Sequence, residues 1–255
     1  MGNSGLICYT KLSPNHSGQR THAIDRITPH CVVGQLSCET ICDCFPAGRN
    51  ASCNYGIGKD GRISLCVEEK NRSWCSSSNA NDQRAVTIEC ASDKSEPYAM
   101  TNAVYASLVK LCVDICKRNG KKKLLWFGDK AKTLAYNPAA DEMVITVHRW
   151  FANKSCPGNW LYSRLGDLAA QVTAQLSGSN GTSGFPATPF QVRVIVSDLN
   201  IRKQPCMGNN TTGKYTGKGV FTIVEVKDGW GKLKSGAGWI WLKNSNYCTV
   251  LNTVG

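Results

Sequence analysis

The chain has 255 residues, of which 42% are apolar and 19% are charged, and its formal net charge is +12. This balance is typical of a soluble globular protein with enough chain for one sizeable core and a smaller second domain. No apolar run is long enough to span a bilayer, and no nucleic-acid-binding motif accompanies the basic charge, so neither a membrane span nor a nucleic-acid partner is expected.

The N-terminal sequence lacks the basic region and the long apolar core of a secretory signal. We therefore expect synthesis in the cytoplasm, as a monomer, with action elsewhere after release. Most of the fourteen cysteines are then expected to be reduced and packed. Cys38 with Cys44 is the first pair to consider for a disulfide formed after release.

The first part of the chain predicts alternating strands and helices. An alternating run over 21–30 predicts a strand that ends on His30. Residues 37–45 predict a helix, and residues 51–58 and 62–67 predict a hairpin with Asp60-Gly61 at its turn.

The same pattern continues to residue 176. A polar loop over 71–84 leads into a β-branched strand, 85–90, that carries one acid, Glu89. Apolar residues at helical spacing predict a helix over 98–119, and a strand over 143–147 precedes a closing amphipathic helix over 161–176. The sum is an α/β domain over 1–176, with a mixed central sheet flanked by helices.

The rest of the chain has a different composition. Residues 177–189 are rich in Gly, Ser and Pro and predict a flexible linker. Residues 190–255 hold short strand patterns separated by glycine turns, which predict a small all-β barrel. Three tryptophans cannot all be core in so small a barrel, so at least one is expected to face a ligand: Trp230, Trp239 and Trp241.

Two soft metal donors, His148 and Cys156, lie eight residues apart across a turn, and Lys154 adds a cation between them. A catalytic zinc takes three protein ligands, and His30 at its strand end is the best third candidate among the remaining histidines. The set His30, His148 and Cys156 is thus a hypothetical site for one Zn²⁺ ion. Packed or solvated residues, or a Cys–His nucleophilic dyad, remain as alternatives.

The stretch His148, Lys154, Cys156-Pro157-Gly158 closely resembles the zinc end of phage N-acetylmuramoyl-L-alanine amidases of the peptidoglycan-recognition fold, and the resemblance covers about residues 6–176. It implies that His30 is the first zinc ligand. It also implies hydrolysis of the amide that joins N-acetylmuramic acid to L-alanine in peptidoglycan.

The resemblance further implies roles for other residues. Glu89 and Tyr55 match positions where different members carry the proton-transfer group, and Lys154 would stabilise the oxyanion together with Tyr55. For Glu89 the alternative is a structural carboxylate paired with Arg84 or Lys154. The loop over 71–81 would line the substrate groove through Trp74, Asn79 and Asn81, and for Trp74 a buried loop anchor is the alternative.

Residues 190–250 resemble bacterial SH3-like cell-wall-binding domains through their Leu-Asn-Ile-Arg and Gly-Trp-Gly-Lys-Leu motifs. Residues 188–255 hold nine Lys or Arg against three acids, which suits anionic wall polymers. Together the resemblances imply a phage endolysin that lyses Gram-positive cell walls. The alternatives are a bacterial autolysin, a peptidoglycan-binding protein without activity, and a Cys–His peptidase.

Overall fold

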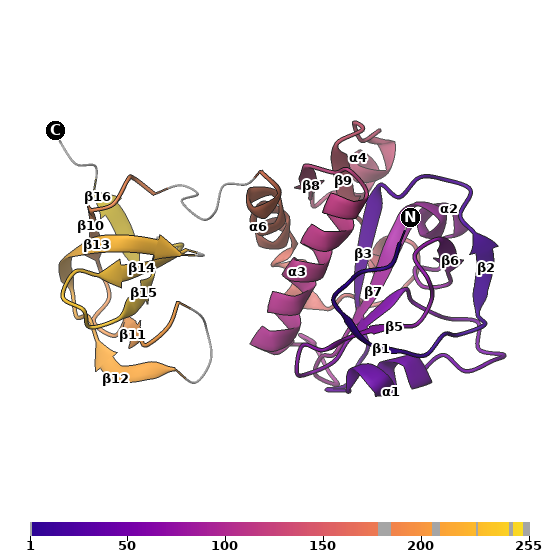
Figure 1. The fold of residues 1–255 in the computed structure, drawn as a ribbon, viewed down its shortest axis with the longest axis horizontal. Coiled ribbons are helices and arrows are strands. Elements are labelled where there is room, and N and C mark those ends of the chain that lie inside the picture. Colours follow the sequence, from indigo (N-terminus) through magenta and orange to yellow (C-terminus); the bar gives the residue numbers. More distant parts are fainter. Residues whose placement is uncertain (1, 178–184, 206–209, 228, 245–246, 252–255) are drawn as a thin grey trace. The chain divides into compact units, whose positions relative to one another are not determined.

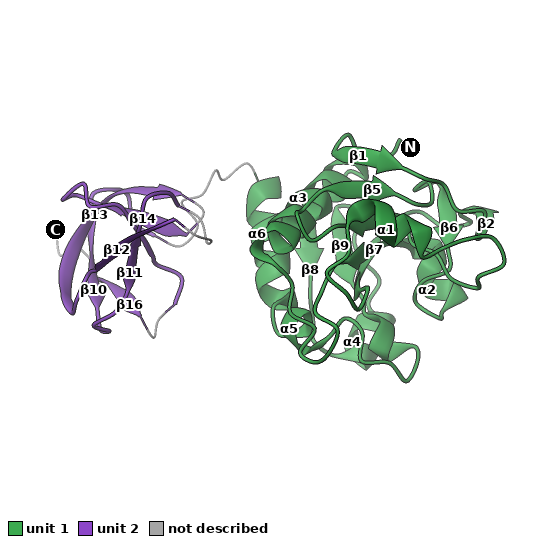
Figure 2. Ribbon diagram, turned by 90° about the horizontal axis from the view of Figure 1, so that it is seen from below, with its two compact units in different colours: residues 1–177 green, residues 178–255 purple. Residues whose placement is uncertain are grey.

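The computed structural model describes residues 2–177, 185–205, 210–227, 229–244 and 247–251. The chain forms two compact units, Met1–Ser177 and Gly178–Gly255 (Figure 2). Most of the predicted linker, residues 178–184, lies outside the described residues.

Unit 1 is built on a seven-stranded sheet with the order β1-β5-β4-β7-β3-β9-β8. All neighbouring strands in it are parallel except β4 and β5, which form the predicted hairpin. The strands are β1 (Ile7–Thr10), β3 (Arg26–Cys31), β4 (Tyr55–Ile57), β5 (Ile63–Leu65), β7 (Ala85–Cys90), β8 (Lys123–Leu125) and β9 (Glu142–Ile145). A separate antiparallel pair joins β2 (His16–Gln19) and β6 (Asn71–Ser73).

Helices cover this sheet (Figure 1). The long helix α3 packs against α6 and β4, while α6 also packs against β8. The shorter α1 packs against β1, β4 and β5, and α2 packs against β6 and β7. The helices are α1 (Cys38–Asp43), α2 (Asn79–Arg84), α3 (Asn102–Arg118), α4 (Lys130–Ala135), α5 (Asn159–Tyr162), α6 (Leu165–Leu176) and the 3₁₀ turn η1 (His148–Trp150).

The segment predicted as a loop over 71–84 is instead the strand β6 followed by the helix α2. Helix α2 begins where the Ser78 side chain accepts a hydrogen bond from the Asn81 backbone. The Asp82 carboxylate accepts hydrogen bonds from the backbone N–H groups of Cys75 and Ser76 and so fixes the chain before the helix. Such a short polar helix depends on caps and carries no apolar period.

Two predicted helices have different bounds in the structure. Helix α3 begins at Asn102 because Thr101 caps it, four residues after the expected start. The closing helix predicted over 161–176 is two helices, α5 and α6, separated by Ser163 and Arg164.

Unit 2 is a single seven-stranded sheet in which every neighbouring pair is antiparallel, with the order β12-β11-β15-β14-β13-β10-β16. The strands are β10 (Phe190–Val194), β11 (Asn200–Arg202), β12 (Thr211–Tyr215), β13 (Gly219–Lys227), β14 (Trp230–Leu233), β15 (Trp239–Trp241) and β16 (Cys248–Leu251). The sequence pattern missed β12 and β16. The predicted fold class is confirmed, with a mixed α/β domain followed by a small all-β unit. Within the described ranges, no helix combines the length and apolar character that a membrane crossing requires.

Candidate metal centre

His30, His148 and Cys156 meet at one edge of the unit 1 sheet. Their donor atoms all lie within 4.8 Å of one another, and Cys156 Sγ is 3.2 Å from His30 Nδ1. The imidazole centroids of the two histidines are 5.1 Å apart. Because β3 and β9 are adjacent and parallel, their carboxyl ends bring His30 and the η1 turn with His148 to the same place. The loop after η1 then returns Cys156 to this edge.

The chemistry of this donor set suits a zinc ion. Two imidazoles and one thiol are the ligand types that zinc prefers, and three protein ligands leave a fourth position open. His30 is 1% exposed, and the ring nitrogen that faces Cys156 Sγ is Nδ1. A cation held by this donor set would be bound through that nitrogen. The other ring nitrogen, Nε2, has no hydrogen-bond partner among the described residues.

The pKa shifts of the cluster also favour metal binding. Burial, and then the charge of His148, hold the pKa of His30 well below its usual value. Burial, and then the charge of Lys154, lower the pKa of His148. Both rings are therefore neutral near pH 7, which is the form that binds metal. Burial raises the pKa of the Cys156 thiol, so without a cation this group is a poor nucleophile.

Glu89 lies beside this cluster. In the register of β3 and β7 it is paired with His30, and a carboxylate oxygen, a His30 nitrogen and Cys75 Sγ lie within 4.8 Å of one another. Glu89 Oε1 has a weak contact with the Cys75 thiol at 3.8 Å, and Oε2 is buried with no partner among the described residues. Burial raises the pKa of Glu89 to about 7, against the smaller opposing effects of Cys75 and Arg49. A carboxyl group with this pKa can both accept and donate a proton near neutral pH.

The alternative of a structural ion pair for Glu89 does not fit the contacts. The guanidinium of Arg84 is paired with Asp25. Lys154 is exposed, and no ion pair within the described ranges joins it to Glu89. Its positive charge is the second cause, after burial, of the lowered pKa of His148.

Tyr55 is not brought to the metal centre. In the register of β4 and β7, Gly56 is opposite Glu89, and Tyr55 is opposite Ile88. Since side chains alternate along a strand, Tyr55 points to the other face of the sheet. Its hydroxyl donates to Glu69 Oε1 at 2.7 Å and accepts from the Ser4 backbone N–H at 2.9 Å. In the structure the Tyr55 hydroxyl is therefore hydrogen-bonded to Glu69 and Ser4. It does not lie beside Glu89, where proton transfer or oxyanion stabilisation was expected.

The three residues expected in the substrate groove differ in position. Trp74 is half-buried and its indole N–H donates to Ser17 Oγ at 2.7 Å, as a loop anchor would. Asn79 is exposed and accepts a hydrogen bond from Arg72. Asn81 is buried, and its side chain forms hydrogen bonds with Arg26 and Thr28 on β3 and with Thr146 just after β9.

Sequence reasoning missed Ser77. Its hydroxyl lies 2.9 Å from His148 Nε2, and its backbone φ is +61°, which is rare for a residue other than glycine. The residue lies in a run of three serines, so no local signal in the sequence separates it from its neighbours.

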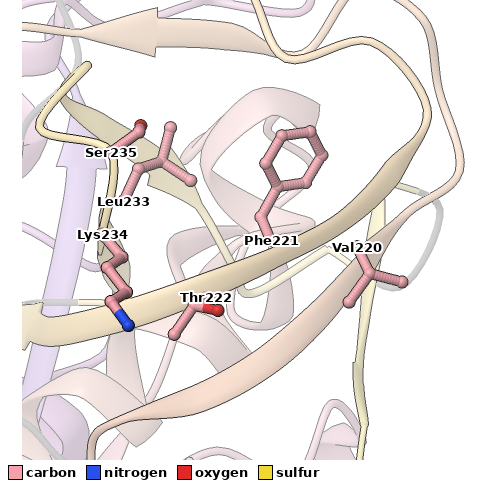
Figure 3. A pocket seen from close by; sticks show the side chains of 6 residues that line it. All are labelled: Val220, Phe221, Thr222, Leu233, Lys234 and Ser235. Carbon is pink, nitrogen blue, oxygen red and sulfur yellow. The ribbon is translucent and has the colours of Figure 1, made fainter.

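The tryptophans of unit 2 lie on one face of its sheet. Trp230 pairs with Trp241 and Lys232 pairs with Trp239 between β14 and β15, so these four side chains share that face. Trp230 and Trp239 are buried and Trp241 is half-buried, and the rings of Trp230 and Trp241 are 5.0 Å apart. None of the three lines the hollow of about 290 Å³ that Figure 3 shows between β13 and β14, lined by Val220, Phe221, Thr222, Leu233, Lys234 and Ser235.

Comparisons with known proteins agree with the resemblance of unit 1. The family model described as N-acetylmuramoyl-L-alanine amidase matches residues 20–159, which is more than half of the chain. No curated protein matches.

Several solved structures are similar to this chain. PlyL is 14% identical, with a TM-score of 0.46, and the match covers 64% of this chain and 95% of PlyL. An AmpD derivative is 17% identical, with a TM-score of 0.46 and coverage of 65% and 96%. The hydrolase AmiA of Staphylococcus aureus is 14% identical, with a TM-score of 0.46 and coverage of 67% and 84%. On the family match, the chain belongs to the N-acetylmuramoyl-L-alanine amidase family.

Proposed function

We propose that unit 1 is a zinc-dependent amidase that hydrolyses the bond between the lactyl group of N-acetylmuramic acid and L-alanine in peptidoglycan. One observation carries this proposal. In a chain of this family, the donor atoms of His30, His148 and Cys156 lie within 4.8 Å of one another, next to the carboxyl group of Glu89.

His30, His148 and Cys156 would hold the zinc ion. When bound, zinc polarises a carbonyl group and lowers the pKa of a water molecule from about 16 towards about 7. Glu89 Oε2 has no hydrogen-bond partner among the described residues, and it would accept the proton of the attacking water. The same carboxyl group, with a pKa of about 7, would then deliver the proton to the leaving amine of L-alanine.

Two other residues would stabilise the negative charge that develops in the reaction and hold a ligand in position. Lys154 would place its ammonium near the oxygen that becomes negative in the tetrahedral state. Ser77, through its contact with His148 Nε2, would hold the orientation of that imidazole. Tyr55 has no part in this proposal, because its hydroxyl is bound to Glu69 on the other face of the sheet.

We propose a wall-binding role for unit 2, as an SH3-like module. The support is the half-buried Trp241, which shares a sheet face with the buried Trp230 and Trp239, together with the cations beside those two buried rings. The Arg202 guanidinium lies 5.6 Å from the Trp230 ring centroid and Lys232 Nζ lies 5.7 Å from that of Trp239. Aromatic rings beside cations suit anionic polymers with apolar or sugar surfaces, such as those of a Gram-positive wall. A lytic role of the endolysin kind follows from joining this unit to an amidase.

The test is digestion of purified Gram-positive peptidoglycan by the full chain, followed by analysis of new end groups. The proposal expects new N-terminal L-alanine that disappears in a zinc chelator and returns when zinc is added. A new amino terminus of another residue that persists in chelator would indicate a Cys–His peptidase instead. Protein that contains zinc and binds the wall, but releases no end group, would be a binding protein.

A further inference from the structure

A cavity of about 500 Å³ lies beside the metal centre in unit 1. The helices α2 and α4 and the segment that begins at η1 contribute most of its wall, and β3 contributes one residue. None of the lining residues is acidic and two are cationic. They are Arg26, Ser77, Ser78, Ala80, Asn81, Lys130, Leu134, Trp150 and Phe151.

Arg26 is the unusual member of this cavity. It is only 7% exposed, and the one hydrogen bond of its side chain within the described residues runs from Nη1 to Asn81 Oδ1, at 3.1 Å. The nearby carboxylate of Asp25 is bound to Arg84. A buried guanidinium is costly unless an anion pairs with it, and no described carboxylate does so. The remaining donors of Arg26 are thus suited to an anionic group that enters the cavity.

The cavity adjoins the metal centre through Ser77. Ser77 lines the cavity and also lies 2.9 Å from His148 Nε2. Trp150 and Phe151, which follow His148 in the chain, form part of the wall. Arg26 and His30 lie on the same strand at even spacing, so both side chains project from the same face of the sheet. A substrate bound at the metal centre could therefore extend past Ser77 and place an anionic group between Arg26 and Lys130.

We propose that this cavity binds a carboxylate of the stem peptide, with Arg26 and Lys130 as its cationic partners. The inference rests on the amidase function proposed above. The lactyl carboxyl group of N-acetylmuramic acid is consumed in the scissile amide, and the sugars of the glycan are uncharged. The negative charges nearest to the scissile bond are the free carboxylates of the residues that follow L-alanine. The leaving peptide, rather than the glycan, is the part of the substrate that supplies an anion here.

The experiment uses the full chain and two soluble muramyl peptides. One peptide carries free carboxylates on the second and third stem residues, and in the other these groups are carboxamides. Release of L-alanine end groups gives kcat/KM for each. The wild type is expected to prefer the acidic peptide by about tenfold or more, mainly through KM, because charge-assisted hydrogen bonds are lost with the carboxamide.

Variants assign the preference to the cavity. Lys130→Met should reduce the preference by about threefold, since Lys130 is an exposed cation at the rim, and Arg26→Met should abolish it. Lys110→Met, an exposed lysine on α3 that does not line the cavity, is the matched control and should keep the full preference. If Arg26→Met fails to fold, the change in peptide preference of Lys130→Met alone tests the inference.

Two results would overturn the inference. One is a wild type that cleaves both peptides with equal kcat/KM. The other is a Lys130→Met variant that retains the full preference for the acidic peptide. A protein that releases L-alanine from neither peptide would instead contradict the proposed amidase function, so the two failures are distinguishable.

Discussion

Two glutamates near opposite faces of the unit 1 sheet, the fully buried Glu69 and the half-buried Glu89, have very different surroundings. The Glu69 side chain is fully buried, accepts hydrogen bonds from Tyr55 and from both terminal nitrogens of Arg118, and forms an ion pair with Arg118. Glu89 has only a weak thiol contact and one oxygen without a partner among the described residues. The carboxylate of Glu69 thus has hydrogen-bond and charge partners on both oxygens, whereas Oε2 of Glu89 has none among the described residues.

Burial alone therefore does not identify a functional carboxylate. A buried ion pair with all its hydrogen bonds fixes the packing around it, whereas a carboxyl group with one buried oxygen that has no partner is retained at a cost in stability. Such a cost is expected where the group has another partner during the reaction. We call Glu69, Arg118 and Tyr55 the satisfied region, because their polar atoms have partners. Glu89 and the metal-centre residues His30, His148 and Cys156 are the unsatisfied region, because Glu89 and His30 each have a buried atom without a partner among the described residues.

The largest effect is expected from Cys156→Ser, which removes the softest donor of the unsatisfied region. Zinc binding should be lost, and amidase activity should fall by about a thousandfold or more, because metal-assisted hydrolysis depends on the ion. Zinc content of the purified protein and end-group release measure the two effects. Circular dichroism serves as the control for folding. A variant with full zinc content and wild-type activity would show that Cys156 is not a ligand.

Glu89→Gln tests the unsatisfied carboxylate directly. Activity should fall by about a hundredfold to a thousandfold, as expected for loss of a proton-transfer group. The free energy of unfolding should stay the same or rise, because an amide is less costly to bury than a carboxylate without a partner. Urea unfolding and kcat/KM are measured on the same preparation. A large loss of stability with little loss of activity would place Glu89 with the structural residues.

Glu69→Gln is the matched change in the satisfied region and should have the opposite result. The change removes the buried charge that pairs with Arg118 and leaves that guanidinium only its ion pair with Asp114, so unfolding should become easier by about 3 kcal/mol. At a temperature where the variant is folded, kcat/KM should stay within about threefold of the wild type. A drop of a hundredfold without loss of stability would break the distinction between the two regions.

Tyr55→Phe is expected to have the smallest effect. Loss of the hydroxyl removes the hydrogen bond to Glu69 and the one from the Ser4 backbone N–H, and should cost about 1 to 2 kcal/mol of stability, with no change in kcat/KM. Urea unfolding and end-group release again provide the measurement. If activity falls by orders of magnitude while stability holds, Tyr55 acts on the reaction from across the sheet.

Much of the architecture could be predicted from the sequence. The strands that carry His30 and Glu89 are β-branched or alternating runs, and the turn at Asp60-Gly61 is a strong local signal, with a φ of +86° at Gly61. The His and Cys donors could be proposed because few residue types bind zinc. These features depend on local pattern or on the chemistry of single residues.

Other features depend on information that local pattern does not contain. Both faces of the central strands are buried, so no polar alternation shows that Gly56, rather than Tyr55, shares the face of Glu89. Helix α2 was missed because Ser78 and Asp82 define it through caps. The role of Ser77 depends on a contact with His148, 71 residues away in the chain.

Gly158 has a consequence for how mutational scans of this loop would be interpreted. Its φ is +81°, and a Cβ atom there would lie 2.7 Å from the Tyr98 Cβ and 2.8 Å from the Pro97 carbonyl oxygen. Only glycine fits this position without displacing the 97–98 backbone. A saturation library would therefore show inactive variants at both 156 and 158, for unrelated reasons. Protein abundance would separate them, because variants at 158 should be depleted as misfolded protein, while variants at 156 should accumulate as folded, inactive protein.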